Sequence, residues 1–337
     1  MRSARKREHI ENYLKTSFQG DTLLGDVFLE HNALPNLNFN DIDTSVEYLG
    51  KRISYPILIN AMTGGSSLTQ EINHDLSMLA KEFNIPMAVG SQTIGLGEDN
   101  DDLESFKVVR GIIGNNGVVI SNLSGQATVE QAKKAIEMVN GDAIQLHLNP
   151  AQELVMEEGD RDFKGIIDNI GDIVRAIDKP VIVKEVGFGI SKDVAQRLYD
   201  IGVRDIDVSG YGGTNFIEIE NLRNHAYDYT ELYSWGIPTA ASVINCRKLP
   251  IDLNVISSGG IRNATDVVKS LALGAQLVGI SGELLSYLVH GGYENAKDYL
   301  ENLIYKVKVL MILLGKENIH ELRKTEYKVT GKLKDLV

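Results

Sequence analysis

The sequence predicts an α/β protein built on a (β/α)8 TIM barrel, with an N-terminal arm and a helical C-terminal extension. Short runs of β-branched and aliphatic residues alternate with amphipathic helical patterns from about residue 56 onward. Eight such runs occur without a break in composition, which favours a closed barrel over an open doubly wound sheet. Glycine-containing turns end the last two runs, as in barrels that bind a phosphate there.

The chain is long enough to bury one large core. Its 337 residues are 43% hydrophobic, and barrels of this class commonly remain a single domain at such lengths. We therefore expect one domain over 1–337, in which 1–55 form the arm, 56–290 the barrel and 291–337 the extension. The arm should begin as a helix, and a long helix should run from about Tyr293 to Leu314.

The individual elements follow from local patterns. The expected barrel strands are Ile57–Ala61, Met87–Val89, Val118–Ile120, Ala143–Leu146, Val181–Val183, Asp205–Val208, Leu253–Ile256 and Gln276–Gly279. Helix starts are indicated by a capping box at Thr128–Gln131 and by N-caps at Ser191 and Asn263. Gly202 and Gly274 should end the helices Lys192–Ile201 and Ala264–Leu273. Because the segment Tyr211–Asn245 is too long for a simple loop, we expect extra helices over the barrel mouth.

Charge and cysteine content limit which binding partners and which cellular compartment we expect for the protein. With 34 basic and 46 acidic residues the net charge is −12, which opposes a nucleic-acid interface. One basic cluster departs from this acidic balance, at Arg2, Arg5, Lys6 and Arg7. Composition alone allows this cluster to be either a solvated tail or a functional segment. Cys246 is the only cysteine, so we expect no intrachain disulfide and a reducing compartment. No apolar run fits a bilayer span or a signal peptide, so we expect a cytoplasmic protein without a membrane partner.

Two late glycine turns are the strongest local signal of a ligand. Ile256–Arg262 and Gly279–Glu283 each follow a predicted strand and precede a predicted helix, so two helix N-termini can meet one phosphate. The alternative is a pair of tight turns that need glycine only for its backbone freedom.

Polar residues gather where the other predicted strands end. Lys184 follows a buried-type strand and needs an anion, which a phosphate, an anionic reduced flavin or a barrel carboxylate such as Glu185 could supply. Glu153 either binds Mg²⁺ or meets the dipole of a first helical turn. His147, taken alone, fits a hydrogen-bonding or substrate-orienting role better than metal ligation.

An ordered set of motifs resembles the type II isopentenyl diphosphate isomerases, which are FMN-dependent. The motifs cover nearly the whole chain: Arg5-Lys-x-x-His-Ile10, Ala61-Met-Thr-Gly-Gly65, His147-Leu-Asn-x-x-Gln-Glu153, Lys184-Glu-Val-Gly-Phe-Gly189, Asp207-Val-Ser-Gly-x-Gly-Gly-Thr-Asn215 and Ser258-Gly-Gly-Ile-Arg262. Each flavin motif alone recurs in related flavin barrels, whereas the ordered set is specific to the family. Two positions depart from its pattern: Thr93 and Tyr211 stand where many members have arginine.

The resemblance implies a set of site residues. FMN would contact Ala61, Met62, Thr63, Ser91, Asn122, Lys184, Ser209 and Thr214, with its phosphate at Gly259, Gly260, Arg262, Ser281 and Gly282. Substrate would meet Arg5, Lys6, His9, His147, Asn149 and Gln152, which makes the basic arm a diphosphate clamp. Glu153 would bind Mg²⁺, and Gln152, Lys184 and His147 would be the catalytic residues.

The resemblance also implies the reaction. Isopentenyl and dimethylallyl diphosphate would be interconverted in isoprenoid biosynthesis, with reduced FMN as an acid-base cofactor, NADPH as the reductant of the flavin, and no net redox change. A homo-oligomer, either a tetramer or an octamer, is implied as well. The rival functions are an FMN oxidoreductase of a small 2-hydroxy acid and a non-catalytic flavin- or phosphate-binding scaffold, and neither gives the basic arm and the His147–Glu153 set a clear role.

Overall fold

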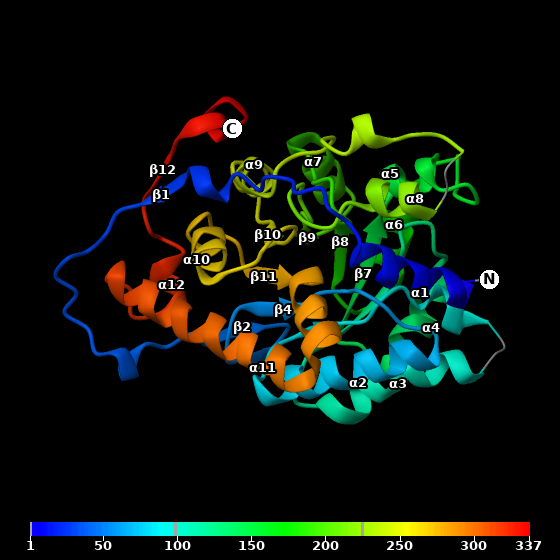
Figure 1. Cartoon of the computed structure of the whole chain (residues 1–337), viewed down its shortest axis with the longest axis horizontal. Coiled ribbons are helices and arrows are strands. Elements are labelled where there is room, and N and C mark those ends of the chain that lie inside the picture. Colours follow the sequence, from blue (N-terminus) through cyan, green and yellow to red (C-terminus); the bar gives the residue numbers. More distant parts are fainter. Residues whose placement is uncertain (1, 98–99, 224–225) are drawn as a thin grey trace.

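The computed structural model describes residues 2–97, 100–223 and 226–337, and gives the backbone alone for 2–5, 7, 67 and 100–102. Within them, eight parallel strands close into the predicted barrel (Figure 1). Their order is β4 (Ile57–Ile59), β5 (Met87–Ala88), β6 (Val119–Ser124), β7 (Ala143–Leu148), β8 (Val181–Glu185), β9 (Asp205–Asp207), β10 (Asn254–Ser257) and β11 (Leu277–Ile280), and β11 pairs with β4. All eight predicted strands are therefore confirmed.

Some strand ends differ from the prediction. β6 runs four residues farther than expected, and β7 and β8 each run two residues farther, so Asn122, His147 and Lys184 lie within strands. The parallel ladder continues through them, with Asn122 opposite Gln145 and His147 opposite Lys184. These polar side chains face the barrel interior and form hydrogen bonds with other polar groups there. The strands can therefore continue through these residues. β4, in contrast, ends at Ile59, two residues before Ala61.

Helices surround the barrel. They are α2 (Ser67–Glu82), α3 (Asn100–Ile113), α4 (Val129–Val139), α5 (Pro150–Val155), α6 (Ile166–Ala176), α7 (Lys192–Asp200), α8 (Phe216–Arg223), α9 (Thr239–Arg247), α10 (Ala264–Ala272) and α11 (Gly282–Leu313). The capping box at Thr128 and the N-caps at Ser191 and Asn263 are present as predicted. α11 contains the expected long helix, with a kink at Gly292, where φ is +73°.

The barrel interior has an apolar lower layer and a polar upper layer. Buried Leu58, Ile120, Ile182 and Ile256 belong to the lower cluster. Since side chains alternate along a strand, the residue two positions later points inward as well. That rule places Asn60, Asn122, Lys184 and Ser258 in the upper layer, immediately beneath the carboxyl ends of the strands. The upper layer therefore forms a polar floor at the carboxyl-terminal end of the barrel, above an apolar core.

The arm and the extension form elements that sequence patterns did not reveal. The arm begins with α1 (Arg2–Tyr13), as expected, but β1 (Val27–Leu29) pairs antiparallel with β12 (Tyr327–Val329) near the C-terminus. A hairpin of β2 (Val46–Tyr48) and β3 (Lys51–Ile53) closes the barrel bottom with buried Tyr48 and Ile53. Short 3-10 helices η1 (Leu24–Asp26), η2 (Phe39–Asp41), η3 (Gln92–Leu96), η4 (Thr230–Leu232) and η5 (Gly331–Asp335), together with α12 (Ile319–Leu322), complete the described elements.

Figure 1 places α1 and the outer end of α11 on opposite sides of the molecule. α1 packs against α8, and α8 packs against α5. The segment between β9 and β10 thus supplies a helix beside the mouth, as its length predicted. In the described part of the chain, no helix is both long enough and apolar enough to cross a membrane.

Candidate active site

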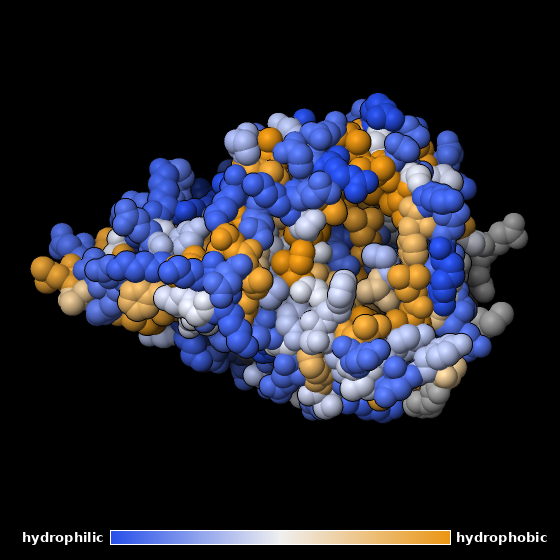
Figure 2. Space-filling model, turned by 90° about the horizontal axis from the view of Figure 1, so that it is seen from above, coloured by the Kyte–Doolittle hydropathy of each residue, from blue (hydrophilic) through white to orange (hydrophobic). Residues whose placement is uncertain are grey.

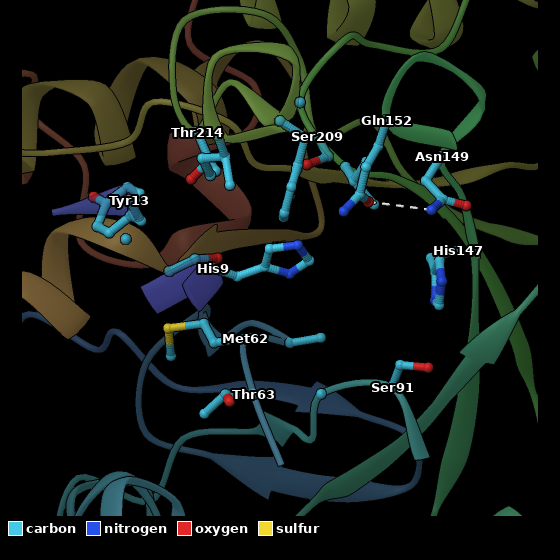
Figure 3. A pocket seen from close by; sticks show the side chains of 18 of the residues that line it. His9, Tyr13, Met62, Thr63, Ser91, His147, Asn149, Gln152, Ser209 and Thr214 are labelled. Carbon is cyan, nitrogen blue, oxygen red and sulfur yellow. Dashed lines mark hydrogen bonds between the residues drawn. The ribbon is translucent and has the colours of Figure 1, made fainter. Parts of the chain in front are cut away.

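A large cavity opens at the carboxyl ends of the barrel strands, above the polar floor. Its volume is about 830 Å³, and it is bounded by strand ends, by α1 and by the N-termini of α5 and α11. Figure 2 shows a hollow on this face, bordered by hydrophobic side chains in orange and polar ones in blue. In Figure 3 the labelled side chains come from opposite walls and surround an open centre.

The structure brings together nearly all the site residues expected from the sequence. The cavity is lined by Lys6, His9, Ala61, Met62, Thr63, Ser91, Asn122, His147, Asn149, Gln152, Glu153, Lys184, Ser209, Thr214, Gly259, Gly260, Arg262, Ser281 and Gly282. The side chain of Arg5 lies outside the described residues. Residues from every barrel strand end thus share one cavity, although their roles there stay predictions.

The two late glycine turns meet at one end of this cavity. Gly259 and Gly260 have φ of +96° and +73°, and a Cβ on either would come within 2.4 Å of a carbonyl oxygen in the Gly210–Gly212 turn. Glycine is therefore required for this close packing. Within the described residues, the backbone N–H groups of Gly260, Ser281 and Gly282 donate to no protein atom. Such N–H groups, with the N-terminus of α11, suit a phosphate.

The wall at β4 holds an unpaired polar atom. Thr63 is 3% exposed, and its hydroxyl has no hydrogen-bond partner in the described structure. Buried hydroxyls are usually paired, so an orphaned one beside a cavity points to a polar ligand. Thr63, the unpaired N–H groups and the apolar Met62 together fit a flat heteroaromatic cofactor with a phosphate tail such as FMN.

Lys184 and Glu185 resolve an alternative that the sequence left open. The ammonium of Lys184, 5% exposed, donates to the backbone carbonyl of Glu185 rather than to its carboxylate. The Glu185 carboxylate instead accepts the N–H groups of Val186, Gly187 and Phe188. Burial raises the pKa of Glu185 to about 7, against the opposing effect of these bonds and of Lys184. Lys184 thus lines the cavity with its ammonium bonded to a backbone carbonyl and not to the Glu185 carboxylate, as the ligand interpretation requires.

The surroundings of His147 favour the neutral form of its imidazole. Burial lowers its pKa to about 3, and the positive charges of Lys184 and Lys6 act in the same direction. Its Nδ1 lies 2.9 Å from Asn122 Oδ1. A neutral histidine in this position can orient a ligand by hydrogen bonding.

Glu220 on α8 links two cavity-lining side chains, His9 of α1 and Gln152 of α5, and the sequence analysis did not identify it. One carboxylate oxygen lies 2.8 Å from His9 Nε2 and accepts from Gln152 Nε2 at 3.0 Å, and the other accepts from Arg223. The side chain is 1% exposed. Burial alone would raise the pKa of Glu220, but the bonds to His9, Gln152 and Arg223 lower it to about 2. The only available signal was an acidic residue within the apolar stretch Phe216-Ile-Glu-Ile-Glu220.

This lowered pKa predicts an acid-labile contribution to stability. A drop from 4.5 to about 2 on folding corresponds to about 3 kcal/mol. Because the folded pKa lies below the unfolded one, this stability is fully present above pH 4.5 and is lost as the pH falls toward 2. Urea unfolding across that range should show the decline in wild type, and a smaller decline in Glu220→Gln would assign it to this residue.

α1 is held over the cavity by several contacts. Lys6 Nζ donates to the carbonyl of Ser91 at 2.8 Å, and Glu8 lies 3.0 Å from Arg223. The backbone N–H groups of Ser17 and Phe18 donate to Glu218 Oε1, which ties the segment after α1 to α8. Tyr13, which the sequence did not single out, places its ring against Gly282 at the phosphate end. The basic arm therefore covers the site, and the solvated-tail interpretation is wrong for Lys6.

Asn149, Gln152 and Glu153 form a bonded cluster at the start of α5. Asn149 Nδ2 donates to Gln152 Oε1 at 3.1 Å and to Glu153 Oε1 at 2.9 Å (Figure 3 draws the first bond). Glu153 also accepts the N–H of Asp160. Glu153 thus lies in the first turn of α5, as the helix-dipole interpretation expects. It also lines the cavity, as the Mg²⁺ interpretation requires. The described residues contain no group of three or more acidic, histidine or cysteine side chains that could hold a metal alone.

The two departures from the family pattern have different surroundings. Thr93 lines the cavity, and its hydroxyl lies 3.1 Å from that of Ser91. Tyr211 is not among the residues that line the cavity, and it packs against Phe18 and Gly20 of the arm. Thr93 thus places a neutral hydroxyl on the cavity wall, whereas Tyr211 contacts the arm.

Comparison with known proteins agrees with this geometry. The family model for FMN-dependent dehydrogenases matches residues 127–329. An isopentenyl-diphosphate delta-isomerase of Bacillus pumilus is 46% identical over 98% of this chain and 92% of its own length. The chain belongs to the isopentenyl-diphosphate delta-isomerase family. A Staphylococcus epidermidis member is 41% identical over 98% of this chain and 95% of its own length. The family is one of FMN-dependent enzymes, as the motif set predicted.

Solved structures share the fold at lower identity. A flavocytochrome b2 mutant with pyruvate bound superposes with a TM-score of 0.70 at 17% identity, covering 97% of this chain and 84% of its own. A mandelate oxidase mutant with an FMN adduct gives 0.63 at 17% identity, covering 96% and 92%. These likenesses confirm the barrel fold and carry no further functional argument.

Proposed function

We propose that the chain interconverts isopentenyl and dimethylallyl diphosphate, using reduced FMN as an acid-base cofactor. The observation that carries the proposal is one cavity with two anion-binding ends. Gly260, Ser281 and Gly282 offer unpaired N–H groups at one end, and Lys6 and His9 of α1 cover the other. A flavin mononucleotide needs the first end for its phosphate, and a diphosphate substrate needs the second.

The substrate end would be built by α1 and α5. We assign diphosphate contacts to Lys6, His9, Asn149 and, by family resemblance, Arg5 and His147. Gln152 is held on both sides of its amide, since its nitrogen donates to Glu220 and its oxygen accepts from Asn149. An amide fixed in this way can keep the alkene at one distance from the cofactor. We therefore give Gln152 a positioning role at the reacting carbons.

The cofactor end would use the remaining cavity residues. Gly259, Gly260, Arg262, Ser281 and Gly282 would hold the phosphate, and Ala61, Met62, Thr63, Ser91, Asn122, Ser209 and Thr214 the ring system. When bound in its reduced form, FMN supplies an acid-base group beside the alkene. One proton is added to the terminal alkene carbon and one leaves the saturated carbon on the other side of the double bond, so the double bond moves by one position and electrons balance without an oxidant. Lys184 would stabilise negative charge on the ring.

Further parts of the proposal rest on the resemblance. Glu153 would bind Mg²⁺ together with the substrate diphosphate, because a carboxylate is a hard ligand and the metal need not be held by protein alone. NADPH would reduce the flavin. A cytoplasmic homo-oligomer completes the proposal.

The rival functions explain less of the cavity. A 2-hydroxy-acid oxidoreductase would share the barrel and phosphate end but would leave α1, fastened over the cavity through His9 and Glu8, without a role. A non-catalytic flavin- or phosphate-binding scaffold would leave the fixed Gln152 amide without a role.

A single-reduction experiment tests the proposed function. The enzyme is reconstituted with FMN, reduced once without oxygen, freed of NADPH, and given Mg²⁺ and isopentenyl diphosphate. We expect many dimethylallyl molecules per flavin while the spectrum remains that of reduced FMN. Product limited to one per flavin, or a continuing need for NADPH oxidation, would exclude the isomerase and favour an oxidoreductase. A protein that binds no FMN would exclude both.

A further inference from the structure

The cavity floor is a continuous chain of polar side chains that crosses the barrel interior. Asn122 Nδ2 donates to Gln145 Oε1 at 3.1 Å, and Gln145 Nε2 donates to Asn60 Oδ1 at 3.0 Å. Asn60 Nδ2 then donates to Asp207 Oδ2 at 2.6 Å. These four residues are at most 2% exposed. With His147, which adjoins Asn122, we call them the interior chain.

Backbone groups fix the direction of every bond in the interior chain. An amide side chain can be turned around, so its donor and acceptor atoms must be assigned from neighbours of known polarity. The N–H of Ala61 can only donate, and it lies 2.9 Å from Asn60 Oδ1, which must therefore be the oxygen. At the far end, the N–H of Ser209 donates to Asp207 Oδ1 at 3.2 Å, which identifies that atom as an acceptor.

The remaining assignments follow one from another. Since Asn60 Oδ1 is an acceptor, the Gln145 atom facing it must be the nitrogen, and Gln145 Oε1 faces Asn122. Asn122 must then present its nitrogen to Gln145 and its oxygen to His147 Nδ1, 2.9 Å away. An oxygen at that distance requires a hydrogen on Nδ1. In a neutral imidazole the other nitrogen, Nε2, then carries a lone pair.

We propose that Asp207 is a positioning residue that acts through Asn60, Gln145 and Asn122 to hold the hydrogen of His147 on Nδ1. Nε2 is thereby kept as an acceptor for a hydrogen-bond donor in the cavity. His147 lines the cavity, and besides Asn122 its imidazole is hydrogen-bonded to the backbone of Leu123, whose carbonyl can only accept. The imidazole assignment is independent of substrate, and only its effect on turnover rests on the proposed isomerase.

Asp207 suits this role because it must accept on both oxygens. Oδ2 takes Asn60 Nδ2, while Oδ1 takes the hydroxyl of Ser258 and the N–H of Ser209. Asparagine at 207 has only one oxygen, so either Asn60 or Ser209 would face another donor. Turning Asn60 around to avoid this would break its bond with Ala61. The hydrogen bonds of the interior chain would therefore no longer all point one way, and His147 would no longer be restricted to one tautomer.

The test is nitrogen NMR of histidine-labelled, FMN-loaded protein, with the His147 signal assigned by its absence in His147→Gln. We expect wild type to show Nδ1 protonated and Nε2 unprotonated near neutral pH. In Asp207→Asn, and in Gln145→Leu, which interrupts the chain at its centre, the Nε2-protonated form should appear. Asp205→Asn is the matched control, because Asp205 is also buried on β9 but bonds Asn254, and it should resemble wild type.

Turnover gives a second readout. Loss of the fixed tautomer should lower kcat by about 10-fold to 100-fold in Asp207→Asn, with FMN occupancy retained. A wild-type His147 that is protonated on Nε2, or a variant spectrum identical to wild type, would overturn the inference. If wild type lacks isomerase activity, the proposed function fails, yet the tautomer measurement still decides this inference.

Discussion

Replacing Glu220 by glutamine is expected to lower kcat/KM by about 100-fold, which corresponds to about 3 kcal/mol of transition-state stabilisation. One oxygen of Glu220 serves His9 and Gln152, and the other serves Arg223. Glutamine offers a single acceptor, so either Arg223 meets an amide nitrogen or Gln152 must turn and break its bond with Asn149. Both outcomes loosen the contact between α1, α5 and α8.

The matched control for this substitution is Glu218→Gln. Glu218 lies on the same helix and is also buried, but it accepts both of its backbone bonds on Oε1, while Oε2 has no partner in the described structure. Glutamine can keep both bonds, so activity should stay near wild type. Steady-state kinetics and FMN occupancy check the pair. Equal losses in both variants would show that any buried charge change on α8 disturbs the site, and Glu220 would have no special role.

The barrel could be predicted because its information is local. Each strand is a short aliphatic run, and each helix carries its own caps, as at Thr128 and Asn263. Strand ends of a barrel converge by geometry, so the polar residues at those ends could be placed together once the strands were counted, whereas Lys6 and His9 of the arm came only from the family resemblance. The same reasoning could not reveal the pairing of β1 with β12, because Val27 and Val329 meet across nearly the whole chain.

Side-chain networks between distant elements were the main omission. The partners of Glu220 come from α1 and α5, 211 and 68 residues away, and no spacing rule connects them. The interior chain was hidden for a different reason. Asn60, Gln145 and Asp207 fall at inward positions of separate strands, where a polar residue in a short sequence run looks like an imperfect strand pattern. Their meaning depends on the closed barrel that brings them into contact.

The second large effect is expected at Glu153, where glutamine should reduce Mg²⁺-dependent activity by about 100-fold and leave FMN bound. Glu153 faces the cavity from the first turn of α5, and removal of its charge takes away a hard ligand while preserving shape. Activity is measured against Mg²⁺ concentration, and flavin occupancy is read from the visible spectrum. A rightward shift of the Mg²⁺ dependence in the variant would assign the carboxylate to the metal.

Glu130→Gln supplies the control, because Glu130 occupies the first turn of α4 and is exposed outside the cavity. Any effect of removing a negative charge from a helix N-terminus should be shared by both variants and amount to about 0.3–1 kcal/mol of stability. If Glu153→Gln loses only that stability and keeps its Mg²⁺ dependence, the carboxylate serves α5 through its bonds to Asn149 and Asp160. Loss of flavin in Glu153→Gln would instead show that the α5 cluster supports the whole cavity, and the metal assignment would be withdrawn.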